Sequence, residues 1–281
     1  MNITYEEVVE ATARLAEEAN FHLPPDVKEA LRKARDEEPS PRGRRILEEI
    51  VTNFSLAEQG DYPLCQDTGT AVVFVELGQE AVISGGSLIT AIEEGVRRGY
   101  TRAHLRPSMV RCPFKRENTG DNSPPVIHVS VVPGRNININ LLAKGAGSEN
   151  VSRLAMFPPA AGWEGIKKFV LETVSEAGPH SCPPLVVGIG IGGNFETCAL
   201  LAKRALLRPL GNSHPSAEIA DREQELLSAI NALGIGPMGF GGQTTALAVH
   251  IETYPCHIAS LPVAVNISCH SLRHKSVLLG E

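Results

Sequence analysis

The chain of 281 residues is 42% hydrophobic, which is enough to bury the core of one large domain or of two modest ones. Its formal net charge of −6 gives no basic field, so neither nucleic acid nor a membrane surface is expected as a partner. The N-terminus lacks the pattern of a signal peptide and no long apolar stretch occurs, so we expect a cytoplasmic protein.

Helical patterns occupy the first part of the chain. Apolar residues recur at helical spacing in residues 5–20, a second segment runs through residues 24–31, and residues 44–57 carry one apolar stripe. Such a stripe should pack on the body of the protein. The sequence therefore predicts a helical N-terminal segment over residues 1–60.

Strand and helix patterns alternate after that segment. This mixture predicts an α/β fold in which the helical N-terminal part packs on a mixed-sheet α/β body. Without a repeat or a linker, we expect a single domain over residues 1–281. Strands are predicted at 70–77, 126–132, 137–142 and 185–191, the second and third as a pair, and helices at 88–98, 163–177, 196–207 and 217–233.

The six cysteines suggest a reducing compartment rather than a disulfide framework. No two of them form a C-x-x-C pair, so any cluster must draw ligands from distant loops. Cys65, Cys182 and Cys269 lie in turn-like contexts where a thiol can point into a cleft. Cys198 fits a buried thiol in a helix, whereas Cys112 and Cys256 fit either description. Three thiolates on a [4Fe–4S] cluster would leave one iron open to a substrate oxygen.

Polar and glycine residues gather in four loops, and loops of this composition often carry function. Each alone also fits a capped turn. Among nine histidines His257 stands out beside Cys256, and Arg106 and Arg111 could each clamp a carboxylate or form a surface ion pair. The four loops are residues 63–70, 116–122, 144–150 and 239–245.

A glycine pattern resembles a dinucleotide-binding motif. Gly188, Gly190 and Gly193 fit G-x-G-x-x-G after an apparent strand. The second strand with an acidic end, which that site needs about 20 residues later, is missing. We therefore expect a tight turn whose following helix faces an anion or simply packs closely.

Several motifs in order resemble the α part of class I, iron–sulfur-dependent fumarate hydratases, and the related L(+)-tartrate dehydratase α subunit is similar. The resemblance covers nearly the whole chain. Its motifs are Asp61-Tyr62-Pro63-Leu64-Cys65-Gln66-Asp67-Thr68-Gly69-Thr70, Arg116-Glu117-Asn118-Thr119-Gly120-Asp121-Asn122, Lys144-Gly145-Ala146-Gly147-Ser148-Glu149-Asn150 and Pro262-Val263-Ala264-Val265-Asn266.

The resemblance implies a [4Fe–4S] cluster held by Cys65, Cys182 and Cys269, with one iron left for the substrate. It implies that a small dicarboxylate is bound by Gln66, Asp67, Arg106 and Gly147, although Ala146 stands where another glycine would be expected. Asp67 and His257 are implied as catalytic residues for the proton on the departing oxygen. The site residues that the resemblance implies are Cys65, Gln66, Asp67, Arg106, Gly147, Cys182, His257 and Cys269.

The resemblance also implies a partner. The base for the C3 proton belongs to a second part of the enzyme, so a β subunit is expected, in an α2β2 or similar oligomer. We rank malate and fumarate ahead of tartrate as substrates. A redox iron–sulfur protein is the first alternative, although its cluster would normally have every iron ligated. A structural zinc or interaction subunit, with cysteines and His257 as ligands, is the second.

Overall fold

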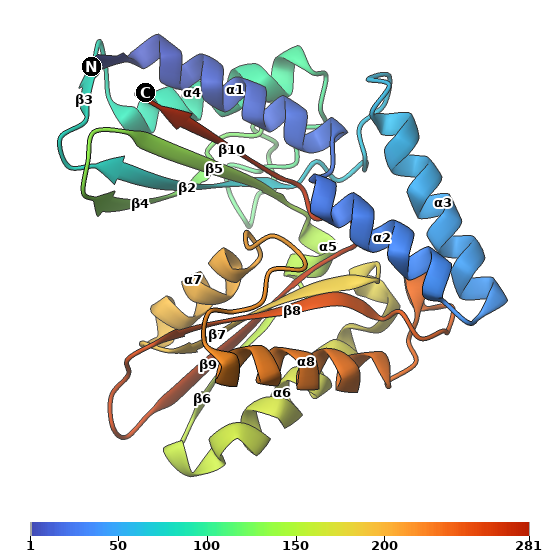
Figure 1. Ribbon diagram of the computed structural model, residues 1–281. Helices are drawn as coiled ribbons and strands as arrows, with labels where there is room; N and C mark the ends of the chain where they lie inside the picture. Colours follow the sequence, from blue (N-terminus) through green and yellow to red (C-terminus); the bar gives the residue numbers. More distant parts are fainter. Residues whose placement is uncertain (1, 281) are drawn as a thin grey trace. The chain divides into compact units, whose positions relative to one another are not determined.

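The computed structural model describes residues 2–280, which form two compact units that interleave along the chain (Figure 1). Unit 1 takes its described residues from Met1–Pro24, Phe54–Ala146 and Arg273–Glu281, and unit 2 consists of Pro25–Asn53 and Gly147–Leu272. The sequence led us to expect one structural unit. Two of the crossings between the units fall inside helices, and the single family domain over residues 1–281 stays a prediction that this division into compact units does not test.

Unit 1 is built on a four-stranded mixed sheet. Its strands lie in the order β10–β5–β2–β4, where β2 pairs antiparallel with β5 and parallel with β4, and β5 pairs antiparallel with β10. A small parallel pair, β1 with β3, accompanies it. The strands are β1 (Asn2–Thr4), β2 (Thr70–Gly78), β3 (Val82–Ser84), β4 (Val126–Val132), β5 (Ile137–Lys144) and β10 (His274–Leu279).

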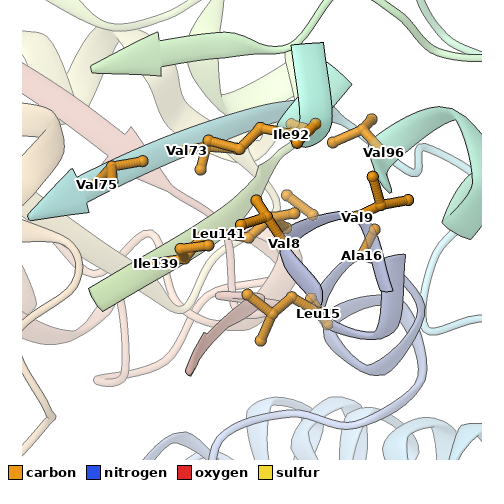
Figure 2. Close-up of a cluster of buried hydrophobic side chains, with 14 of the residues drawn as sticks. Val8, Val9, Leu15, Ala16, Val73, Val75, Ile92, Val96, Ile139 and Leu141 are labelled. Carbon is orange, nitrogen blue, oxygen red and sulfur yellow. The ribbon is translucent and has the colours of Figure 1, made fainter. Parts of the chain in front are cut away.

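Two helices, α1 (Tyr5–Phe21) and α4 (Leu88–Arg102), build the core of unit 1 with this sheet. Figure 2 shows apolar side chains of both helices meeting valine, isoleucine and leucine side chains of β2 and β5. Gly95 and Gly99 of α4 permit the close approach to α1, because a Cβ at either position would lie 2.5 Å from an atom of α1. The expected α/β fold with a helical N-terminus is confirmed.

The predicted pairing of residues 126–132 with 137–142 is wrong, although both strands exist. Strand β2 lies between β4 and β5 and bonds to both. The four residues that join β4 to β5 cross the end of β2, where Gly78 N donates to Asn136 O at 2.9 Å and Gln79 N to Val132 O at 2.8 Å. A short connection suggested a hairpin, but four extended residues can also span two strand spacings.

Unit 2 has three layers. Its sheet runs β6–β9–β7–β8, with β7 parallel to β8 and antiparallel to β9. Helices α6 and α8 share one apolar core with the sheet, and α7 packs on the opposite face (Figure 1). The strands are β6 (Arg153–Phe157), β7 (Leu185–Gly192), β8 (Ala246–Tyr254) and β9 (Leu261–Ser268). The helices are α2 (Pro25–Glu37), α3 (Pro41–Ala57, whose last turn belongs to unit 1), α5 (Ala146–Glu149), α6 (Gly162–Ala177), α7 (Phe195–Ala205) and α8 (Ala217–Asn231).

The glycine pattern serves close packing of α7 on β7. A Cβ at Gly188 would lie 2.1 Å from Ala202 O, and a Cβ at Gly190 would lie 2.0 Å from Cys198 O. The N-terminus of α7 is capped by its own chain, since Asn194 Oδ1 accepts a bond from Thr197 N at 2.9 Å. Of the two expectations for this motif, close packing is the one that the structure supports.

No helix within residues 2–280 combines the length and the apolar character that crossing a membrane requires.

Candidate active site

In unit 1 the loop of Cys65, Gln66 and Asp67 joins α3 to β2. Cys65 is half-buried and Gln66 is exposed. Asp67 Oδ1 accepts a hydrogen bond from Gly69 N at 3.0 Å, and Asp67 Oδ2 accepts one from Ala146 N at 2.7 Å. These two backbone donors fix the orientation of the carboxylate, while each oxygen keeps a lone pair for another proton or donor.

Two buried side chains shape this loop. Tyr100 of α4 donates its hydroxyl to Thr68 O at 2.8 Å, and burial raises the pKa of that hydroxyl to about 12. Asn122 donates its amide to Gly69 O at 3.0 Å and accepts from Ser108 N at 2.7 Å. The second polar loop of the sequence therefore acts on the first through Asn122, which the sequence alone did not reveal.

Arg106 lies beside the same loop. Its carbonyl accepts a bond from the Thr68 hydroxyl at 2.5 Å, while its side chain is exposed. Unit 1 thus brings Cys65, Gln66, Asp67 and Arg106 together.

The sequence analysis missed a second arginine in this region. Arg273 is 2% exposed and donates from Nη1 to Asn20 Oδ1 at 3.1 Å. The carbonyl of Asn20 accepts from Leu64 N, the residue before Cys65, at 2.8 Å. The closeness of Arg273 to Cys269 in sequence, with three residues between them, gave no hint of this contact, because it depends on the path of the chain into β10.

In unit 2 the segments of Cys182 and Cys269 adjoin each other. Cys182 O accepts hydrogen bonds from His270 N at 3.3 Å and from His270 Nδ1 at 3.0 Å. Both thiols are half-buried. Cys182 has φ 53° and ψ 62°, a left-handed conformation that costs a non-glycine residue about 1 kcal/mol or more. Two of the three predicted ligands thus come from neighbouring loops.

Gly147 lies in unit 2 beside the Cys182 segment. It is exposed, and a Cβ at this position would lie 3.6 Å from His180 O, two residues before Cys182. A Cβ would make an ordinary van der Waals contact with that carbonyl, so the distance shows that the two segments are neighbours. The structure brings together Gly147, Cys182 and Cys269 within one unit.

His257 lies at the other end of the unit 2 sheet. It is exposed in the loop between β8 and β9, and its Nδ1 accepts from Ala259 N at 3.1 Å. Cys269 follows the opposite end of β9, whose eight residues span roughly 26 Å. Proximity in sequence suggested that His257 joins the cysteines, but the strand between them carries it away within one chain.

The fourth polar loop, residues 239–245, is held by a buried carboxylate that sequence reasoning missed. Glu38 is 1% exposed and accepts bonds from the backbone N–H groups of Gln243, Thr244 and Ser40 at 2.8–3.1 Å. Burial favours the neutral acid, but these donors prevail and lower the pKa of Glu38. The loop thus has a structural explanation.

The thiols of Cys65, Cys182 and Cys269 are a donor type that both iron–sulfur clusters and structural zinc sites use. Among the residues that the structure describes, no three His, Cys, Asp or Glu side chains form a ready metal site. Cys65 belongs to unit 1, whereas Cys182 and Cys269 belong to unit 2. Because iron–sulfur clusters are held by thiolates, the half-buried cysteines of these loops provide the required donor type. Cys198 is fully buried in α7, and burial raises the pKa of its thiol, as expected for an inert cysteine.

Comparison with known proteins gives a consistent result. The chain matches the profile of the family described as Fumarate hydratase (Fumerase) over residues 9–278. It is 47% identical to the "Putative L(+)-tartrate dehydratase subunit alpha" of Methanocaldococcus jannaschii, over 93% of this chain and 94% of that relative. It is 33% identical to the L(+)-tartrate dehydratase subunit alpha of Escherichia coli O157:H7, over 97% of this chain and 90% of that relative. The resemblance inferred from the motifs is thereby confirmed: the chain belongs to the fumarate hydratase (Fumerase) family and is a hydro-lyase.

Proposed function

We propose that this chain is the α subunit of a [4Fe–4S]-dependent hydro-lyase that interconverts (S)-malate with fumarate and water. The observation that carries the proposal is the position of Arg106 beside the loop of Cys65, Gln66 and Asp67, in a member of the fumarate hydratase family. The dicarboxylate needs a cation for its carboxylate and a group that exchanges a proton with the oxygen on C2, and Arg106 and Asp67 are groups of these two types.

Cys65, Cys182 and Cys269 would hold the cluster. When bound through three cysteines, such a cluster supplies a Lewis-acidic iron for the hydroxyl group of the substrate. The hydrogen bonds between His270 and the Cys182 carbonyl support the assignment of the last two ligands, since they keep the two loops together.

The remaining side chains bind substrate and move a proton. Dehydration of malate breaks the C2–O and C3–H bonds and forms the C2=C3 bond, and the departing hydroxide takes up a proton to leave as water. Arg106 holds a carboxylate, with Gln66 and the Gly147 backbone as further contacts. Asp67, oriented by two backbone donors, handles the proton on the oxygen that departs from C2. A β subunit carries the remaining catalytic residues, including the base for C3.

We propose that His257 acts at the site of a second copy of the chain, next to the Cys269 of that copy. The length of β9 keeps it from the Cys269 end of its own sheet. An oligomer of the α2β2 type would supply the second copy. Mixing chains that carry His257→Ala with chains that carry Cys269→Ser should then restore activity, because each mixed pair retains one intact site. Failure of every mixture to recover activity would remove His257 from the mechanism.

L(+)-tartrate is the second candidate substrate. The names of the relatives favour it, since both proteins compared above are called L(+)-tartrate dehydratase subunit alpha. Tartrate differs from malate by one hydroxyl group, a difference that a few contacts decide. Fumarate formation from malate and oxaloacetate formation from tartrate, measured on the same α–β preparation, give the two kcat/KM values. The larger value identifies the substrate.

The test of the cluster begins with anaerobic purification of the α chain together with its β partner. About four irons per α chain, with a [3Fe–4S] EPR signal after mild oxidation, are expected. Cys65→Ser, Cys182→Ser and Cys269→Ser should each lose iron, whereas Cys256→Ser, which alters an exposed thiol, should retain it. Zinc in place of iron, or equal iron in all four variants, would reject the proposal.

The proposal places the enzyme in the cytoplasm. Six cysteines without a disulfide fit a reducing compartment, and an iron open to substrate is also open to oxidants. Exposure of the anaerobic complex to air should therefore abolish activity and release iron. Full activity after prolonged exposure would contradict the open-iron assignment.

A further inference from the structure

A polar network in unit 2 connects the turn after Gly147 to the strand before Cys269. Glu149, the last residue of α5, accepts a bond on Oε2 from Asn266 Nδ2 at 3.0 Å and forms a close ion pair through Oε1 with Lys203 of α7. Asn266 lies on β9, three residues before Cys269. One carboxylate therefore contacts two elements of the unit at once.

A second side chain reinforces the same connection. The Ser152 hydroxyl donates to Ser148 O at 3.1 Å and accepts from Ile267 N at 3.0 Å. Ser148 follows Gly147 directly. Residues 148–152 are thus bound to residues 266–267 by two independent side chains, Glu149 and Ser152.

The amide of Asn266 costs stability at its buried position, which suggests a role in the polar network. It is 7% exposed, and its Oδ1 has no hydrogen-bond partner among the described residues. Its neighbour on the same face of β9, Ala264, packs with Cys198 and Ala202 of α7. An apolar residue would avoid burying an unsatisfied carbonyl oxygen, so stability alone does not explain an amide here.

We propose that Glu149 and Asn266 are positioning residues that fix the backbone of Gly147 relative to the strand that presents Cys269. This inference rests on the proposed roles of Gly147 in substrate binding and of Cys269 in cluster binding. In this inference the two residues act through the backbone that they hold, and they are not catalytic residues. The network sets the separation of two segments that must serve the same reaction, and Lys203 keeps the Glu149 carboxylate in its orientation.

The test uses the anaerobic α–β complex and three variants of the network. Asn266→Leu removes the amide at nearly constant volume, Glu149→Ala removes the carboxylate, and Glu149→Gln keeps an acceptor for Asn266. Lys167→Met is the matched control, because it removes a comparable ion pair with Glu225 elsewhere in the same unit.

We expect Asn266→Leu and Glu149→Ala to raise KM about tenfold, the effect of one lost hydrogen bond to a charged group, with kcat within about twofold and iron content unchanged. Amide hydrogen exchange in residues 145–152 should accelerate in both. Glu149→Gln should recover most of the KM, and Lys167→Met should change neither quantity.

Two results would overturn the inference. Unchanged KM and unchanged exchange in folded Asn266→Leu and Glu149→Ala complexes would make the network purely structural. Loss of iron with KM unchanged would show that the strand, and not the Gly147 turn, depends on it. If Asn266→Leu does not fold, Glu149→Ala alone decides. A wild-type complex without hydro-lyase activity would reject the proposed function instead, and the exchange rates would then decide on positioning.

Discussion

Replacement of Asn122 by alanine should destabilise unit 1 and loosen the Asp67 loop. Asn122 is fully buried, donates to Gly69 O at 3.0 Å and accepts from Ser108 N at 2.7 Å. Each buried backbone group left without its partner costs about 1–3 kcal/mol. The residue also has φ 60°, a conformation that costs alanine about 1 kcal/mol more than it costs asparagine or glycine. The sum is about 3–7 kcal/mol.

The series Asn122→Ala, Asn122→Gly and Asn122→Asp separates these contributions. Glycine loses both hydrogen bonds but tolerates the positive φ, so Asn122→Gly should be about 1 kcal/mol more stable than Asn122→Ala. Aspartate keeps the acceptor for Ser108 N and loses the donor to Gly69 O, so Asn122→Asp should have an intermediate stability. In the α–β complex the variants should also raise KM, because Gly69 N holds Asp67.

Urea denaturation of the α chain, followed by circular dichroism, measures the three free energies of unfolding. Hydrogen exchange at residues 65–70 reports the loop directly. A stability of Asn122→Ala within about 0.5 kcal/mol of the wild type would refute the reasoning, since two buried bonds cannot be lost at so low a cost. Asn122→Gly less stable than Asn122→Ala would refute the argument from φ.

Three further predictions concern unit 2. Glu38→Gln should lower the free energy of unfolding by about 2–4 kcal/mol, because the new NH₂ group faces backbone donors; urea denaturation measures this, and an unchanged midpoint would contradict it. Burial, with Arg208 nearby, lowers the pKa of His250 from 6.5 to about 4. The contribution of neutral His250 to the free energy of unfolding, about 3 kcal/mol, is therefore complete above pH 6.5 and is lost as the pH falls towards 4. His250→Gln should flatten the stability of unit 2 between pH 6.5 and 4 in urea titrations, and an unaltered pH slope would contradict this. Gly190→Ala should abolish the packing of α7 on β7 through a 2.0 Å clash with Cys198 O, visible as insoluble protein or a greatly lowered Tm, whereas a normal Tm would contradict the clash.

The sequence by itself determined the elements and the chemistry of the loops. Helical periodicity located α1, α4, α6, α7 and α8, and runs of β-branched residues located β2, β4, β5 and β7, because both signals are local. The motifs around Cys65 and Gly147 also identified the family, which the comparisons confirm. Strands β1, β3, β6, β8, β9 and β10 were not predicted from these signals.

Only the tertiary structure decided which of these parts meet. It inserted β2 between β4 and β5, and it placed His257 at the opposite end of β9 from Cys269, because strand order and direction depend on contacts between distant segments. It also assigned Asn122 to the Asp67 loop and Glu38 to residues 243–244, 205 positions away. Hydrogen bonds of buried side chains to distant backbone groups leave no periodic trace in the sequence, so the fold alone reveals them.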